Sequence, residues 1–159
     1  MNNPVTDTEK LAFKKRLRDK CIALIEQRIV AAANAVTNAQ AAANAEEKSS
    51  AGDKYETSRA MSHLEKDMQA RQLAANREEL QALSTIACLS LYDSATAGSF
   101  IQCELCSFFI AAGLGKINFE GRDIYLISPN APVAKALFNK KQGSVISFNK
   151  KEMVIMVIF

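Results

Sequence analysis

The chain has 159 residues, of which 48% are apolar and 23% charged, and its formal net charge is +3. This length allows one ordinary domain or two small ones and excludes a large multidomain enzyme. The small excess of positive charge gives no reason to expect nucleic-acid binding from bulk electrostatics. No apolar run approaches the roughly 18 residues that span a bilayer, and no short apolar segment follows a basic start. We therefore expect a cytoplasmic protein with no membrane partner.

Residues 1–90 have the composition of long helices. Ala, Leu, Glu, Lys, Gln and Arg dominate this half, and Pro4 and Gly52 are its only proline and glycine. A first helix is predicted over about 8–47, and small or apolar residues recur along it every three or four positions: Ile22, Ile25, Ile29, Ala32, Val36, Ala39 and Ala43. This spacing is the seam of a coiled coil, and so long a helix needs a partner along its length.

The partner is predicted to be a second helix that begins after residues 46–52, where Ser and Gly interrupt the apolar pattern. Apolar residues then resume: Met61, Leu64, Met68, Leu80, Leu83 and Ile86. Arg71 and Glu78 stand where seam residues are expected, which predicts a stutter or a looser pairing there. Residues 1–90 are thus expected to form a long antiparallel coiled-coil hairpin with its tip near 46–56, and the Ala-rich seam should make it slender.

The start of the first helix, residues 9–20, is basic and carries apolar Leu11, Phe13 and Leu17. Such a segment fits either an interfacial helix at a membrane or the base of the hairpin packing on the second domain. Acidic residues within it and the continuation of the helix favour packing.

Residues 91–159 have the texture of a small antiparallel sheet with one helix. Short β-prone runs separated by Gly, Asn and Pro predict strands over 99–106, 107–112, 123–127, 144–148 and 153–159. A helix is predicted from Pro132 to about Phe138, because proline fits a first helical turn. The predicted core comprises Phe100, Phe108, Phe109, Ile110, Ile124, Leu126, Leu137, Ile146, Phe148, Val154 and Met156. The fold class is therefore α+β.

Cys103 and Cys106 have the spacing of a zinc knuckle. A structural zinc site takes four ligands, and the remaining candidates, Cys21, Cys88 and His63, lie in or next to the predicted hairpin. If the two cysteines share a strand, their side chains point to opposite faces. We therefore expect buried free thiols rather than a metal site. No catalytic triad, phosphate loop or dinucleotide motif is present, so a self-contained enzyme is not expected.

The C-terminal segment 115–159 contains an ordered series of matches to one family pattern: Ser128, Pro129, Pro132, Ala136, Leu137, Lys140 or Lys141, and Gly143. With these residues the segment resembles the C-terminal domain of the bacterial Gre family of transcript cleavage factors. The order of a long helical hairpin followed by a small FKBP-like sheet domain is also that of the family. The resemblance implies RNA polymerase as the partner, with the sheet domain, including Ser128, Pro129 and Pro132, gripping the rim of its secondary channel.

In that family, an Asp and a Glu separated by two residues follow a Gly at the hairpin tip, and Gly52, Asp53 and Glu56 match this arrangement. The resemblance implies that the hairpin enters the channel and that Asp53 and Glu56 help to hold a Mg²⁺ shared with the polymerase active site. Two metals can then promote hydrolysis of backtracked RNA. The polymerase remains the enzyme, and the chain alone binds no cofactor and no small-molecule substrate.

The residues themselves leave the chemistry of the tip open. Residues three apart on a helix share a face, so both carboxylates can point outward, although two carboxylates alone bind Mg²⁺ weakly. The same pattern is also a capping box with Asp53 as N-cap. Tyr55 can stack on an RNA base or lie against the helices, and Lys54 and Arg59 can meet phosphates or solvent.

Two further functions stay open at this point. Thr57, Ser58 and Arg59 replace the usual continuation of the family motif, which favours a regulator that occupies the channel without stimulating cleavage. The second open function is that of an FKBP-like isomerase or interaction module. Its active cleft needs an aromatic-lined pocket, and this chain has few residues that could line one.

Overall fold

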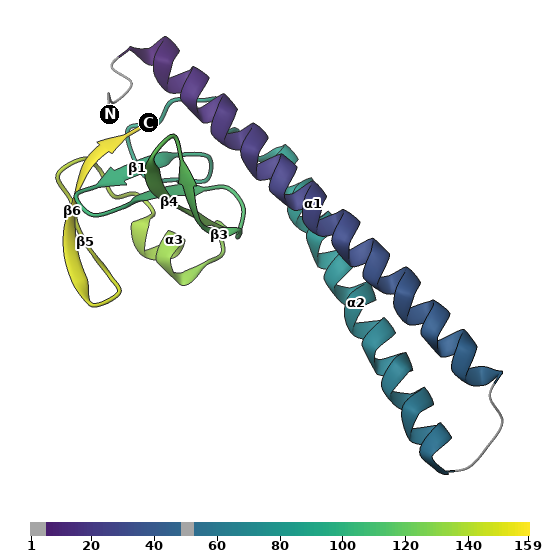
Figure 1. The fold of residues 1–159 in the computed structure, drawn as a ribbon. Coiled ribbons are helices and arrows are strands. Elements are labelled where there is room, and N and C mark those ends of the chain that lie inside the picture. Colours follow the sequence, from purple (N-terminus) through teal and green to yellow (C-terminus); the bar gives the residue numbers. More distant parts are fainter. Residues whose placement is uncertain (1–5, 49–52) are drawn as a thin grey trace. The chain divides into compact units, whose positions relative to one another are not determined.

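A computed structural model describes residues 6–48 and 53–159 (Figure 1). Its elements are α1 (Asp7–Glu47), α2 (Asp53–Thr85), β1 (Phe100–Cys103), β2 (Ser107–Ile110), β3 (Gly115–Phe119), β4 (Arg122–Ile127), α3 (Pro132–Leu137), β5 (Val145–Phe148) and β6 (Lys151–Ile158). The chain divides into two units. The hairpin unit is Ile25–Leu80, and the sheet unit combines Met1–Leu24 with Gln81–Phe159.

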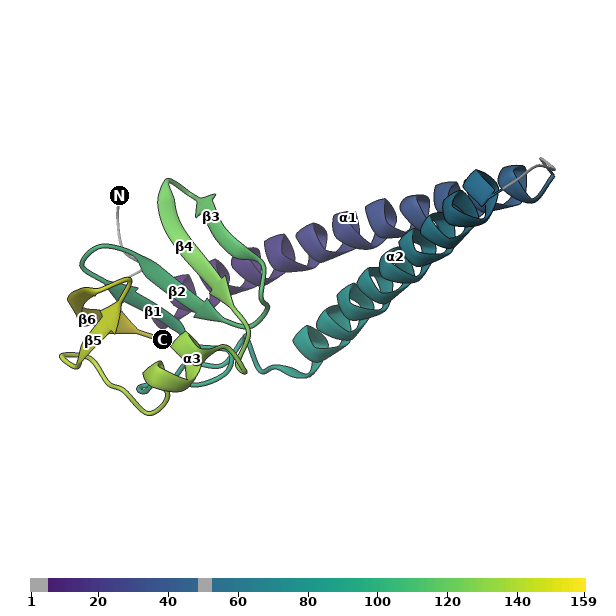
Figure 2. The same cartoon turned by 90° about the horizontal axis from the view of Figure 1, so that it is seen from below.

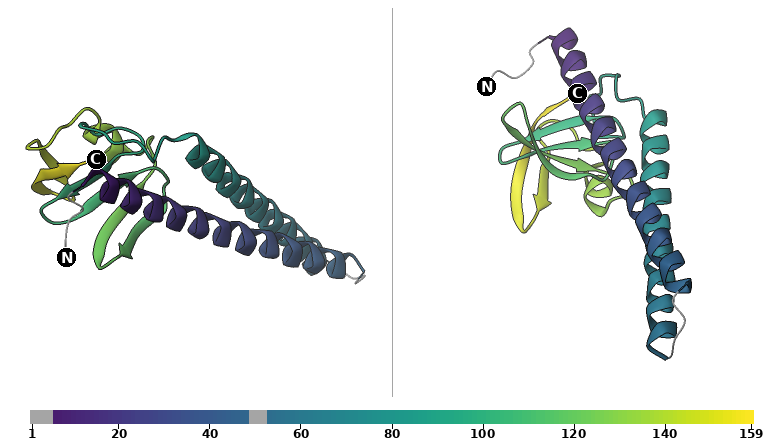
Figure 3. Two further views of the ribbon diagram at one scale, coloured as in Figure 1. Left: turned by 90° about the horizontal axis from the view of Figure 1, so that it is seen from above. Right: turned by 45° about the vertical axis from the view of Figure 1, so that its right-hand side comes forward.

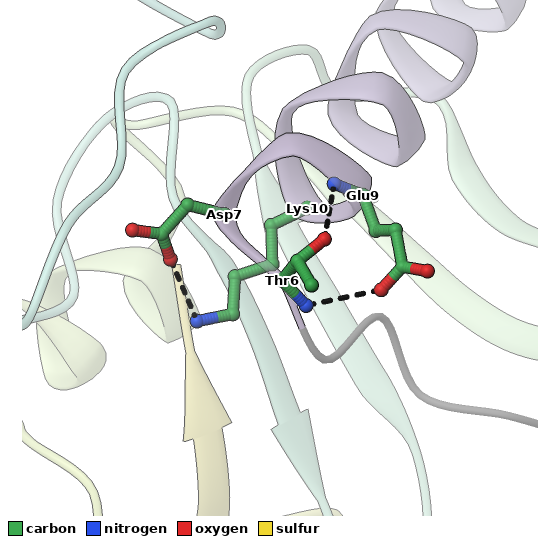
Figure 4. A network of polar contacts seen from close by, with 4 residues as sticks. All are labelled: Thr6, Asp7, Glu9 and Lys10. Carbon is green, nitrogen blue, oxygen red and sulfur yellow. Dashed lines mark hydrogen bonds and ion pairs between the residues drawn. The ribbon is translucent and has the colours of Figure 1, made fainter.

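Helix α1 begins with a capping box (Figure 4). The Glu9 N–H donates to Thr6 Oγ1 at 3.2 Å, and the Thr6 N–H donates to Glu9 Oε2 at 3.0 Å. An ion pair between Lys10 Nζ and Asp7 Oδ1, at 3.3 Å, lies on the same turn. These bonds satisfy backbone N–H groups that have no partner within the helix, which explains why α1 begins here.

In the hairpin unit, α1 and α2 pack together, as predicted. The seam predicted on α1 is confirmed, because Ile25, Ala32, Ala39 and Ala43 are buried. On α2, the least exposed positions also alternate in steps of four and three, but most of them are polar: Ser62, Lys66, Gln69, Leu73, Asn76 and Leu80. This helix therefore turns a largely polar stripe inward.

The predicted seam at the start of α2 is wrong. Met61, Leu64 and Met68 are 63%, 65% and 58% exposed. Met61 lies one position before Ser62, and Leu64 and Met68 each lie two positions from Lys66. Because each residue turns a helix by about 100°, these three exposed side chains occupy a different face of α2 from the inward-facing stripe. Burial is confirmed for Leu83 further along the helix.

The sheet unit contains one six-stranded sheet in the order β3-β4-β2-β1-β6-β5. Figure 2 shows the β3–β4 ribbon at one edge and the β5–β6 ribbon at the other. The sheet was expected to be antiparallel throughout, but it is mixed, because β2 pairs with β4 in parallel. After β2 the chain forms the edge strand β3 and then returns as β4, which lies between β3 and β2. Strand β1 pairs with β6, and Phe100 and Phe159 exchange N–H···O bonds of 2.7 and 3.0 Å beyond the ladder.

Two details of the strands differ from expectation. Strand β3 was not predicted, because only alternate residues of this exposed edge strand are even partly buried. In β6, Met153 and Ile155 are buried, whereas Val154 is half-buried and Met156 is 49% exposed. Both faces of β6 are apolar in sequence, so alternation alone could not select the inner one.

The core of the sheet unit lies on both faces of the sheet. Phe13 of α1 is buried and meets Phe100 and Phe159 edge-on, with ring centroids 5.0 and 6.2 Å away. Figure 3 shows the start of α1 running along the sheet. This confirms the packing predicted for residues 9–20. A second cluster, on the other face, includes Ile101, Phe108, Ile110, Leu137 and Ile155.

Candidate functional site

The predicted site at the hairpin tip is described only in part. Asp53 is the first residue of α2, but its side chain and those of Lys54 and Tyr55 lie outside the described residues. Glu56 lies in the first turn of α2 and is exposed. The joint presentation of two carboxylates by Asp53 and Glu56 therefore stays a prediction, and Glu56 is available to a partner from solvent.

Arg59 forms an ion pair across the two helices. Its Nη2 lies 3.4 Å from Oε1 of Glu47, the last residue of α1, and both side chains are about half exposed. Exposed pairs of this kind stabilise a protein by about 0–1 kcal/mol, so Arg59 can exchange Glu47 for a phosphate at little cost. Arg59 also stands three residues after Glu56, which brings a positive charge to the same face of α2.

Ser128, Pro129 and Pro132 form the connection from β4 to α3 in the sheet unit. The Ala131 N–H donates to Ser128 O at 2.9 Å, and the Asn130 N–H donates to Ser128 Oγ at 3.3 Å. Pro132 is the first residue of α3 and is exposed. The first turn needs no N–H from this position, which explains the proline. Ser128 and Pro132 thus each have a local structural role, and contact of this connection with a partner stays a prediction.

Sequence reasoning missed a buried lysine in the sheet unit. Lys14 is fully buried, its Nζ donates to Ser90 O at 2.5 Å, and Nζ lies 4.7 Å from the ring centroid of Tyr92. Burial lowers the pKa of Lys14 from 10.5 to about 8, and nearby Cys88 partly offsets this. Its burial could have been predicted from its position, because Lys14 continues the seam spacing of α1 backward from Leu17 and Cys21. Lys14 fastens the segment after α2 to α1.

The four cysteines are free thiols, and three of them are buried. Burial raises the pKa of Cys21 and of Cys103 to about 12. The predicted strand over 99–106 is too long, because β1 ends at Cys103, so Cys103 and Cys106 do not share a strand and the argument for opposite faces does not apply. They end β1 and precede β2 on either side of a two-residue turn, and the Cys103 N–H donates to Cys106 O at 2.9 Å.

Other expected features of the surface can be compared directly. His63 is exposed on α2, as expected of a surface helix histidine. Within residues 6–48 and 53–159, no group of three or more His, Cys, Asp or Glu side chains is placed to hold a metal ion. Neither long helix, over the same residues, has an apolar stretch of the length needed to cross a membrane.

Comparisons with protein-family models, with curated proteins and with solved structures return no match.

Proposed function

We propose that this chain is a Gre-like factor that binds RNA polymerase and inserts its helical hairpin into the secondary channel. There it supplies carboxylates for Mg²⁺-assisted cleavage of backtracked RNA by the polymerase. The observation that supports this proposal is the hairpin itself: α1 and α2 pack together, and exposed Glu56 lies in the first turn after the connection. The proposal includes an FKBP-like character for the sheet unit and a cytoplasmic location.

The chemistry requires the polymerase to complete the metal site. Mg²⁺ takes six oxygen ligands in near-octahedral geometry and usually keeps waters and phosphate oxygens. Asp53 and Glu56 can supply only part of this set, so the chain alone has no activity in this proposal. Within the channel, the carboxylates would hold the second metal and orient the attacking water, and two metals would stabilise the attacking and leaving oxygens.

The seam of the hairpin supports the insertion step. The buried positions of α1 towards the tip are alanines, including Ala39 and Ala43. Alanine adds little width to a helix pair, whereas Leu or Phe at these positions would increase the separation of the axes. A narrow pair of helices is suited to a confined channel.

Cleavage of a stalled, backtracked elongation complex in Mg²⁺ tests the proposal. We expect the wild-type protein to shorten the RNA from its 3′ end, and Asp53→Asn/Glu56→Gln to abolish shortening while polymerase binding is retained. The matched control is Glu65→Gln/Asp67→Asn, which removes two exposed carboxylates further along α2 and should act like wild type. Absence of both binding and cleavage with wild-type protein would contradict the whole proposal.

A channel-occluding regulator is the second candidate, and the position of Arg59 favours it. A cation one turn after Glu56 weakens the attraction of that face for Mg²⁺. An occluding protein slows nucleotide addition without shortening the RNA, so the same assay separates the two functions. Arg59→Ala should then restore some cleavage if the Asp53 and Glu56 pair is otherwise competent.

A further inference from the structure

Two cysteines face each other across the turn between β1 and β2. The ladder pairs Gln102 with Ser107, so the next pair is Cys103 with Cys106, and the hydrogen bond between their backbones agrees with this register. Both side chains pack in the cluster that contains Ile101, which places them on one face of the sheet. Directly opposed residues have Cβ atoms about 4.5–5.5 Å apart, so the two thiols can share one ligand.

A third sulfur lies beside this pair. Met153 of β6 is 3% exposed, and the Cys106 thiol contacts its Sδ at 3.8 Å. Strand β6 pairs Ile155 with Cys103, and Met153 lies two positions earlier, on the same face as Ile155. Strands β1 and β6 and the residue that precedes β2 therefore each contribute one sulfur to the same cluster of side chains.

We propose that Cys103, Cys106 and Met153 form a binding site for Cu(I), with two thiolates and one thioether as ligands. Thiolate and thioether sulfurs are the donors that favour this soft cation. Structural zinc takes four N, S or O ligands, and the described residues contain no such group of even three His, Cys, Asp or Glu. The site uses only residues of the sheet unit, and it does not depend on the function proposed above.

Access and charge are compatible with this ligand. Cys106 is half-buried, and both cysteines border a shallow hollow at the end of the β1–β2 hairpin. Binding converts two thiols to thiolates and releases two protons, leaving one net negative charge on the Cu(I) centre. Burial raises the pKa of the Cys106 thiol, nearby Lys116 lowers it, and Asp123, which forms an ion pair with Lys116, raises it. Because protons compete with the cation, binding should strengthen as pH rises.

The test is anaerobic titration of the reduced full-length protein with Cu(I) in competition with a chromogenic Cu(I) chelator. We expect one Cu(I) per chain and a sulfur-only first shell of three atoms by X-ray absorption. Cys106→Ser should weaken binding by about 100-fold or more, beyond the typical cost of losing an outer-shell group. Met153→Leu preserves side-chain volume and should weaken binding roughly tenfold without unfolding the protein.

The matched control is Cys21→Ala/Cys88→Ala, which removes the other two thiols and should bind Cu(I) like wild type. Circular dichroism verifies that each variant is folded, and the half-buried position of Cys106 makes its serine variant informative even if a change at Cys103 unfolds the sheet. Binding that survives Cys106→Ser, or that is lost in the control, overturns the site. An unchanged affinity in Met153→Leu overturns the three-sulfur assignment, as does tighter binding of Zn²⁺ than of Cu(I).

Discussion

The sheet unit and the hairpin unit bury different kinds of side chain. Large aromatic residues, such as Phe13, Phe100 and Phe159, are almost completely buried in the sheet unit. In the hairpin unit the buried residues include Ala39, Ala43 and Asn76. Burial of a large apolar side chain contributes roughly 1.5–3 kcal/mol, and alanine much less. The comparison shows that the spacing of small side chains can define a helix pair that gains little hydrophobic stabilisation.

The largest contrast should appear when apolar side chains are truncated. Phe13→Ala removes a buried ring from between α1 and the sheet, and we expect the free energy of unfolding to fall by about 3–5 kcal/mol. Leu64→Ala, at a position 65% exposed on α2, should change it by less than about 0.5 kcal/mol. Urea unfolding followed by circular dichroism measures both. Equal losses of unfolding free energy for the two variants would contradict the proposed difference in hydrophobic stabilisation between the units.

Asn76 tests the same difference between the units within the hairpin unit. It is 8% exposed on α2 and accepts a hydrogen bond from Gln72 Nε2 at 3.2 Å. A polar residue in a helical seam fixes partner and register at a cost in stability. Asn76→Leu should therefore stabilise the hairpin by about 1–2 kcal/mol and introduce higher oligomers. Thermal melts and sedimentation velocity measure the two effects, and Asn38→Leu, at an exposed position of α1 in the hairpin unit, is the control. A less stable, monomeric Asn76→Leu protein would contradict this role.

The buried lysine makes the stability of the sheet unit depend on pH. The pKa of Lys14 is about 8 when folded and 10.5 when unfolded, so the unfolded chain binds more protons between these values. Lys14 by itself should therefore add about 1 kcal/mol of stability between pH 8 and 9. Buried Cys21 and Cys103, with pKa values of about 12, oppose this over the same interval because they stay protonated while unfolded thiols ionise, so the stability of the protein should change little up to about pH 9 and fall above it.

Urea unfolding at several pH values measures this profile. Lys14→Met should become less stable between pH 8 and 9, because the contribution of the thiols is no longer offset, while Lys15→Met, at an exposed neighbouring position, should keep the wild-type profile. The same profile in both variants would assign the effect to another group.

The smallest expected effect concerns the turn between β5 and β6. Asn149 and Lys150 have φ values of 52° and 63°, and two consecutive positive φ angles are typical of a type I′ hairpin turn. Lysine is strained there and glycine is not, so Lys150→Gly should stabilise the protein by about 0.5–1 kcal/mol. Lys151→Gly, within β6, should destabilise it by a similar amount. Melting temperatures that shift in the same direction would contradict the argument.

The sequence was most informative where one face of an element is strongly apolar or small. The α1 seam, the start of α3 at Pro132 and the burial of Phe100 and Phe108 all followed from such patterns. The inner face of α2 could not be found in this way, because Ser62, Lys66 and Gln69 occupy it while methionines face solvent. Hydrophobicity indicates burial only where burial supplies the stability.

The pairing of strands that are distant in the chain could not be predicted from the sequence either. Nothing local in β2 and β4 distinguishes a parallel from an antiparallel neighbour, and both faces of β6 are apolar. The thiols of Cys103 and Cys106 came together for the same reason, since their opposition depends on a turn that the sequence pattern did not locate. Lys14 was missed because a charged residue is almost never fully buried unless it is paired.

The pairing of β1 with β6 has a consequence for biosynthesis. Ile101 aligns with Ile158, so an inner strand of the sheet lacks one neighbour until β6 has left the ribosome. Nascent chains therefore pass through a stage in which the edge of β1 is open, and an open strand edge is prone to aggregation. The hairpin of α1 and α2 depends on no such late arrival and can form while the rest of the polypeptide is still being translated.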